Sequence, residues 1–226
     1  MKKKFPEVKT AFTLAETLLT LAIVGVIAAL TIPTLKDHSD EVRYVSATKK
    51  AFATINAATT AIETKHGDAM FWKFDQEKTI NWYKEAMNTL PTQNLNSWEK
   101  ADLEGNAETF TPNFITADGM AWEIKQDDEY SCGGGAAYVD LNGPQAPNVI
   151  GVDIHGFRLG APCNGAAKTG DWGVYAMGDG LNDTNAAWAC PAYVIKNGKM
   201  PWMTDMSIKK CDDIIGSGSS DQDDTI

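Results

Sequence analysis

The sequence predicts an α+β protein, in which a long N-terminal α-helix that begins inside a membrane packs on a C-terminal head with an antiparallel β-sheet. Two observations carry this prediction. From Thr17 to Leu35 the chain has 19 uncharged, mostly apolar residues, close to the roughly 20 that cross a bilayer core as a helix. From about Thr109 onward, short apolar runs separated by Asp-Gly and Asn-Gly turns replace the helical pattern.

The apolar run carries an acidic residue near its start, which neither an ordinary signal peptide nor a plain membrane anchor explains. Lys2, Lys3 and Lys4 would suit the basic end of a secretory signal peptide. However, the run is too long for one, Glu16 interrupts its start, and no small-residue cleavage site follows Pro33. A plain anchor helix fits the length but leaves Glu16 without a partner, at a cost on the order of a few kcal/mol in hydrocarbon.

The segment Ala11-Phe12-Thr13-Leu14-Ala15-Glu16 lies between a short basic leader and a long apolar helix with Pro33 near its end. This arrangement resembles the N-terminus of type IV pilins and type II secretion pseudopilins, over about the first 35 residues. The resemblance implies cleavage between Ala11 and Phe12 by prepilin peptidase, followed by N-methylation of Phe12. It also implies that Glu16 neutralises the new amine of a neighbouring subunit in a filament. The family usually has Gly before the cut, where this chain has Ala11.

The helix is expected to continue beyond the membrane over residues 36–66. One apolar stripe, with spacings of three and seven residues, follows this part of the helix: Val42, Val45, Phe52, Ile55 and Ile62. Gly67 is a plausible stop. Pro33 lacks a backbone donor, so we expect a kink near the membrane exit. A coiled coil is the alternative use of this stripe, but the stripe is short, so it predicts packing against the chain's own head, which is also the pilin-like arrangement.

The expected organisation has five parts. These are a leader (1–11), a transmembrane and polymerisation helix (12–35), its amphipathic continuation (36–66), a globular head (67–215) and an acidic disordered tail (216–226).

Within the head, the pattern predicts one helix and then a meander of strands. The helix covers 76–90 and ends at Pro91. A hairpin joins 114–116 to 120–124 through the Asp118-Gly119 turn, and further strands are expected at 138–141, 151–159, 172–177 and 192–196. The apolar phase slips at Gly156, which predicts a β-bulge there.

The charge of the chain is uneven and sets both its orientation and its partners. The leader holds four of the 20 basic and one of the 30 acidic residues, which leaves 16 and 29 in the mature part, a net charge of −13. The basic leader is expected to stay cytoplasmic while the head is exported. An acidic head is a poor partner for nucleic acid, whose phosphates are normally bound by clustered Lys and Arg.

Four cysteines lie in the exported half, at Cys132, Cys163, Cys190 and Cys211. They lack paired CxxC spacing, so a zinc site is not expected, and an oxidising compartment favours disulfides over free buried thiols. Four cysteines allow three pairings, which the sequence does not decide. We predict Cys190–Cys211 and Cys132–Cys163, because neighbours then close a C-terminal loop of about 20 residues. The resemblance agrees, since pilins often close a loop near the C-terminus in this way.

Asp140, Asn142 and Asp153 offer hard oxygen ligands near one turn, of the type that calcium prefers. The segment resembles one common in pilin-like heads, and some pseudopilins bind calcium in a comparable loop, although with a different spacing. Asx turns explain the same residues without a metal. No arrangement of His, Cys and Ser indicates a catalytic nucleophile, so the sequence does not predict an enzyme.

Taken with the resemblance, these features predict a structural subunit of a type II secretion or type IV pilus-like filament. Its expected partners are prepilin peptidase, other pilin or pseudopilin subunits, the inner membrane and an assembly platform. The alternative is a monomeric, single-pass inner-membrane protein whose exported acidic head binds a ligand. The sequence leaves open whether the filament is a secretion pseudopilus or a surface pilus, and whether the subunit is major or minor.

Overall fold

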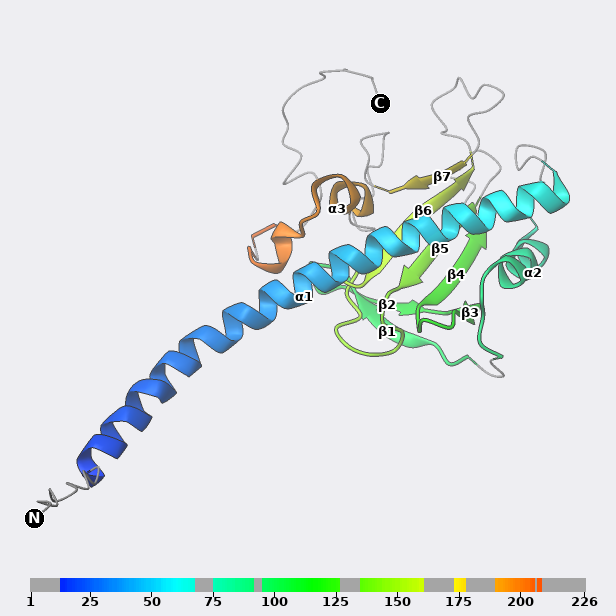
Figure 1. Ribbon diagram of the computed structural model, residues 1–226. Helices are drawn as coiled ribbons and strands as arrows, with labels where there is room; N and C mark the ends of the chain where they lie inside the picture. The colour runs from blue at the N-terminus through cyan, green and yellow to red at the C-terminus, as the bar shows by residue number, and fades with distance from the viewer. Residues whose placement is uncertain are drawn as a thin grey trace, which may run out of the picture. The chain divides into compact units, whose positions relative to one another are not determined.

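The computed structural model describes residues 13–67, 75–91, 95–126, 135–160, 173–177, 190–205 and 207–208, and of residues 32–38 only the backbone. The chain separates into two compact units, Met1–Asp40 and Glu41–Ile226. The fold is α+β, as predicted, with an apolar N-terminal helix and antiparallel sheets (Figure 1).

Helix α1 spans Leu14–His66, 53 residues, and so contributes to both units. It ends where the sequence predicts. Gly67 adopts a φ of 87°, and its N–H donates to the carbonyl of Glu63 at 2.8 Å; such a conformation is accessible to Gly at no steric cost. Helical conformation continues through Pro33, whose side chain lies outside the described part, so the kink there stays a prediction.

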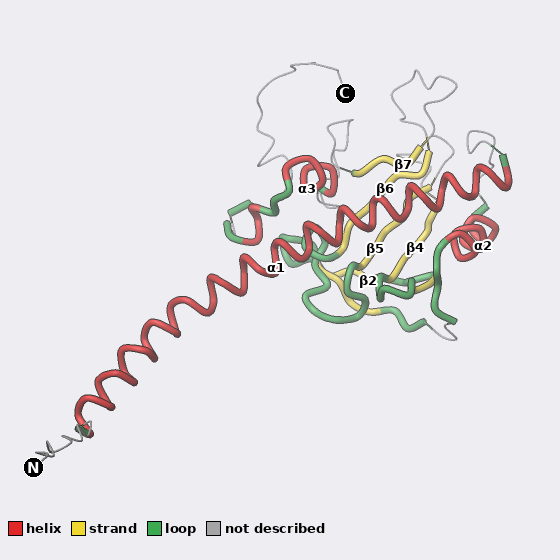
Figure 2. Tube along the Cα trace, viewed as in Figure 1, coloured by secondary structure: helices red, strands yellow, loops and turns green. Residues whose placement is uncertain are grey.

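The main sheet of the head is a five-stranded antiparallel meander in the order β3-β4-β5-β6-β7 (Figure 2). Its strands are β3 (Phe114–Ile115), β4 (Ala121–Gln126), β5 (Gly135–Asp140), β6 (Ile154–Gly160) and β7 (Gly173–Ala176). The predicted hairpin is present, with Gly119 at a φ of 89° in its turn. Each strand pairs with its neighbour in sequence, as predicted from consecutive short strands joined by turns.

The second half of α1 lies across one face of this sheet (Figure 1). The ring of Phe52 lies 5.6 Å from that of Phe157 on β6, and the register places Ile124 and Ala137 on the same face as Phe157. Among its described side chains, the helix buries eight against the head: Tyr44, Val45, Thr48, Ala51, Ile55, Ala58, Thr59 and Ile62. The predicted stripe is therefore wrong at Val42, which is 53% exposed, and it omitted the small residues that let the helix approach closely.

A separate two-stranded hairpin, β1 (Trp98–Ala101) and β2 (Ala107–Phe110), contacts the other face of the sheet. The indole Nε1 of Trp98 donates to Oδ2 of Asp140 on β5 at 2.9 Å. The ammonium of Lys100 lies 6.0 Å from the ring centroid of Tyr138, also on β5. This face is unusually polar for a buried surface, because Glu123, Tyr138 and Arg158 all alternate onto it.

Helix α2 spans Gln76–Ala86 and is shorter than predicted. It begins at Asp75, whose side chain accepts the N–H of Lys78 at 3.1 Å. Beyond Ala86 the chain instead bonds to the β3 region: the N–H of Leu90 donates to Ile115 and that of Ala117 to Asn88. Pairing with the edge of the sheet therefore replaces the last predicted turn of the helix.

The predicted strand at 192–196 is wrong, because this segment forms helix α3 (Pro191–Asn197). Pro191 occupies the first turn, where its missing N–H costs nothing. Gly198 closes the helix with a φ of 65°, and its N–H donates to Val194 at 2.8 Å. A short 3-10 turn, η3 (Pro201–Met203), follows. A Pro at the start and a Gly at the end are helix signals that outweigh the β-branched residues between them.

The predicted bulge at Gly156 is also wrong. Strand β6 pairs with β5 in regular register through Tyr138↔Gly156, and all seven of its residues are buried. A Cβ on Gly156 would lie 2.5 Å from the sulfur of Met177 and 3.1 Å from the ring of Tyr138. The glycine therefore makes room for two side chains, and the phase slip arises because both faces of the strand are covered.

Candidate functional site

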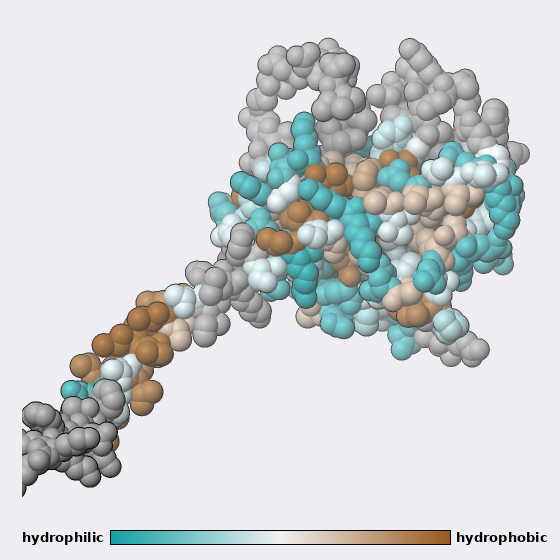
Figure 3. Space-filling model, in the orientation of Figure 1, coloured by the Kyte–Doolittle hydropathy of each residue, from teal (hydrophilic) through white to brown (hydrophobic). Residues whose placement is uncertain are grey.

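The apolar part of α1, Leu14–Thr31, is long and apolar enough to cross a membrane (Figure 3). Its nine large apolar side chains are 51–77% exposed within the chain: Leu14, Leu18, Leu19, Leu21, Ile23, Val24, Val26, Ile27 and Leu30. Such a continuous exposed apolar surface is stable only when lipid or other helices cover it. The same length and composition occur in signal sequences, so this observation alone does not establish an anchor.

Glu16 closes the first turn of this helix. Its Oε2 accepts the backbone N–H of Thr13 at 2.9 Å and the hydroxyl of Thr13 at 2.8 Å. In return, the N–H of Glu16 donates to the hydroxyl oxygen of Thr13 at 3.2 Å. This is a capping box, which satisfies backbone donors that a helix start otherwise leaves unpaired. The Thr-x-x-Glu spacing is the sequence signal that could have predicted this cap.

Both Thr13 donors reach the same carboxylate oxygen. Within the described residues, Oε1 of Glu16 takes part in no hydrogen bond. The second oxygen therefore remains available to a partner outside the chain. The predicted processing residues, Ala11 and Phe12, lie outside the described residues.

The three predicted calcium ligands do come together, at the loop that joins β5 to β6. Asp140 ends β5, and its Oδ1 accepts the N–H of Asn142 at 3.2 Å. Asp153 precedes β6 and accepts the N–H of Asn148 at 2.9 Å and of Val149 at 2.7 Å. Both aspartates are fully buried, and Trp98 occupies the second oxygen of Asp140.

Burial dominates the electrostatics of this acidic pair. The pKa of Asp140 is raised to about 7, chiefly by burial and then by the negative charge of Asp153, while the bond from Trp98 opposes the shift. Burial likewise raises the pKa of Asp153 to about 6, against the backbone bonds of Val149 and Asn148. The pair therefore holds a proton near neutral pH more tightly than an exposed aspartate does.

These contacts give Asp140 and Asp153 a structural role. The Nδ2 of Asn142 donates to the carbonyl of Ala146 at 3.1 Å, and its Oδ1 is buried without a hydrogen-bond partner among the described residues. Each carboxylate oxygen of the two aspartates accepts a hydrogen bond from the protein, which is the Asx-turn explanation weighed from the sequence. No group of three or more His, Cys, Asp or Glu side chains in the described ranges could hold a metal ion. Calcium binding stays a prediction.

Of the four cysteines, only Cys190 lies in the described residues. It is buried and disulfide-bonded, in agreement with an oxidised head. Its partner and the other predicted members, Cys132, Cys163 and Cys211, lie outside the described residues. The pairing stays a prediction.

Sequence reasoning missed a buried polar cluster under the β1–β2 hairpin. The Lys100 side chain is 1% exposed and pairs with Glu108 at 3.3 Å. Glu123, 2% exposed, pairs with Lys125 at 2.9 Å through one oxygen, while its other oxygen has no partner. Burial lowers the pKa of Lys100, although Glu108 opposes the shift. The alternation of charged and apolar residues in Ala121–Gln126 indicates a strand with a polar and an apolar face. It does not indicate that both faces of the sheet are covered.

No family model, curated protein or solved structure matches this chain. What the protein does must therefore be argued from its own residues and their geometry.

Proposed function

We propose that this protein is a pilin-like structural subunit of a filament of the type II secretion or type IV pilus kind. Prepilin peptidase removes residues 1–11, Phe12 is methylated, and subunits associate through the apolar half of α1. In this proposal the chain begins as a single-pass inner-membrane protein with its leader in the cytoplasm and its head exported.

The observation that carries the proposal is Glu16. It is the only charged residue between Lys9 and Lys36, and it lies in the first turn of the apolar helix. A carboxylate in such surroundings persists when a cation pairs with it. Cleavage after Ala11 creates such a cation on Phe12, and the oxygen of Glu16 that Thr13 does not use is available to the amine of a neighbouring subunit.

The architecture of the head adds a second, weaker support. The second half of α1 packs on an antiparallel meander, with Phe52 against Phe157. A helix that continues from an apolar segment into such a sheet is the arrangement that the N-terminal resemblance implies.

The capping box favours the second candidate function, a monomeric anchored protein. Because Thr13 satisfies Glu16 within one chain, the carboxylate has a role even without a neighbour. Two variants separate these roles. Glu16→Gln keeps an acceptor for the cap, since Gln serves at this position of a capping box, but it removes the charge. Thr13→Val removes the capping hydroxyl and keeps the charge.

The experiment expresses both variants beside the cognate peptidase and confirms cleavage by intact mass. Assembly is then measured by crosslinking between subunits and by recovery of sheared filaments. In a filament, Glu16→Gln leaves a buried amine unpaired, at about 3–5 kcal/mol per contact, so assembly is lost. The Thr13→Val variant, by contrast, retains most of its assembly. Normal assembly of cleaved Glu16→Gln would reject the charge-pairing role, and no crosslinking in the unaltered chain would favour the monomeric anchor.

A further inference from the structure

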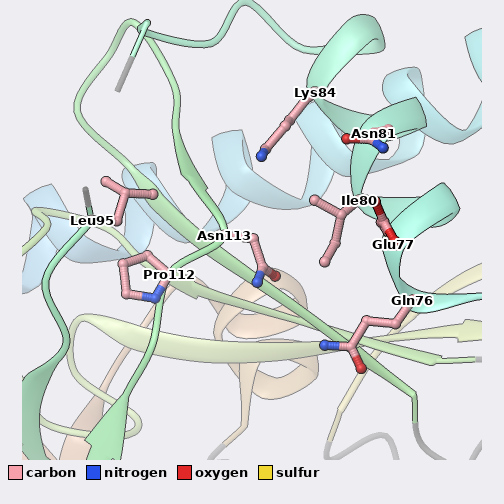
Figure 4. A pocket seen from close by; sticks show the side chains of 8 residues that line it. All are labelled: Gln76, Glu77, Ile80, Asn81, Lys84, Leu95, Pro112 and Asn113. Carbon is pink, nitrogen blue, oxygen red and sulfur yellow. The ribbon is translucent and has the colours of Figure 1, made fainter. Parts of the chain in front are cut away.

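A surface cavity of about 690 Å³, wide open to solvent, lies between helix α2 and the segments around Leu95 and Asn113 (Figure 4). Its volume falls in the range of small-ligand sites, and five of its eight lining residues are polar or charged. Ile80, Leu95 and Pro112 supply the apolar surface. No residue of the acidic pair or the N-terminal helix lines it, so it is distinct from the features discussed above.

The two ends of the cavity carry opposite charges. Glu77 lies in the first turn of α2 and Lys84 in its last turn, and both line the cavity. Seven residues of helix separate them by about 10 Å along the axis. In Figure 4 the Lys84 side chain reaches toward Leu95 and Asn113, while Gln76 lies at the opposite end. Neither charged group has an ion-pair partner among the described residues.

Carboxamides lie between and beside these charges. Oδ1 of Asn113 accepts the backbone N–H of Ile124, and this bond fixes the amide and leaves its Nδ2 donors for a ligand. Gln76 presents a second amide, which both donates and accepts. Side-chain amides suit a chain of peptide groups, which also alternate donors and acceptors.

We propose that this cavity binds a short peptide with free ends, about three residues long. An extended tripeptide spans roughly 10 Å, which matches the separation of the two charged ends. Its ammonium lies at Glu77, its carboxylate lies at Lys84, and its central side chain rests on Ile80 and Leu95. The peptide groups bond to Gln76 and Asn113. This activity is separate from filament assembly and is measured on the unassembled chain.

The test titrates the purified full-length chain in detergent with Ala-Leu-Ala by isothermal calorimetry. Two capped peptides serve as probes: one is acetylated at the N-terminus and the other is amidated at the C-terminus. Each cap removes one terminal charge and is expected to weaken binding by up to about fivefold, the upper end for one exposed ion pair, since Glu77 and Lys84 are both exposed. Binding of the uncapped peptide that does not saturate at millimolar concentration would overturn the proposal.

Variants assign each end of the peptide. With Glu77→Gln, the acetylated and free peptides bind equally while the amidated peptide remains weaker. With Lys84→Met, the amidated and free peptides bind equally. Lys78→Met is the matched control, because Lys78 lies on the same helix but over the ring of Trp82, 4.5 Å from its centroid; it leaves all affinities unchanged. Circular dichroism checks that α2 persists in each variant. Caps that act identically in the unaltered chain and in both variants would overturn the assignment.

Discussion

Asp140 and Asp153 form a buried acidic pair at the loop between β5 and β6. Asp140 and Asp153 were predicted as calcium ligands, yet hydrogen bonds from Trp98, Asn142, Asn148 and Val149 account for their oxygens. Because both carboxyl groups are buried close together, the free energy of unfolding depends on pH.

Between about pH 4 and pH 7 the folded chain holds protons on this pair that the unfolded chain has released, because the pKa of Asp140 is raised from 3.8 to about 7. The contribution of the pair to stability is therefore fully present below about pH 4 and is lost as the pH rises through about 7. Asp140→Asn keeps an acceptor for Trp98 but cannot ionise. We expect the unaltered chain to lose about 2 kcal/mol more than this variant between pH 5 and pH 8, measured by urea unfolding. Equal losses would contradict the raised pKa.

At the scale of elements, the sequence predicted the long helix and the meander correctly because their signals are local and repeated. The helix keeps its apolar period over many turns and ends at Gly67, and the turn residues separate the strands. The errors have tertiary causes. α2 ends early because residues 88–90 bond to the β3 region, and Gly156 accommodates Tyr138 and Met177. Both contacts join segments that are far apart in the sequence, so the local pattern does not predict them.

The correction to the α1 stripe makes a matched pair of variants possible. Ile55 is fully buried and Val42 is 53% exposed, although both belonged to the predicted stripe. We expect Ile55→Ala to lower the free energy of unfolding by about 2–5 kcal/mol through the cavity it leaves. Val42→Ala should change it by less than about 0.5 kcal/mol. Urea unfolding followed by tryptophan fluorescence measures both, and similar losses would show that the helix does not pack in this register.

At the scale of the whole molecule, processing and oxidation set the form in which the chain acts. The first prediction here is that the mature chain begins with N-methylated Phe12 when it is made beside its cognate peptidase. Intact-mass measurement of the membrane-extracted protein tests it. Retention of residues 1–11 in that setting would contradict the filament proposal, whereas the fold of the head would be unaffected.

The second prediction at this scale is that Cys190 bonds to Cys211 and Cys132 to Cys163. Cys190 is disulfide-bonded, and closing a C-terminal loop of about 20 residues stabilises by roughly 3 kcal/mol. Peptide mapping of exported protein without reduction should recover these two pairs. Cys190→Ser should lower stability by a similar amount, and recovery of a peptide that links Cys190 to Cys132 or Cys163 would show the pairing to be different.

The packing of the second half of α1 on the sheet has a mechanical consequence. Its buried residues, from Tyr44 to Ile62, contact the head over about five turns. A pull along the helix axis must slide all of these contacts at once, in shear, rather than peel them apart in succession. At the same end of the head, Glu41 accepts the backbone N–H of Met200 at 2.8 Å, so a load that enters at Glu41 also reaches the C-terminal segment. We therefore expect tension along this helix to be resisted by the whole interface together and not by one contact at a time.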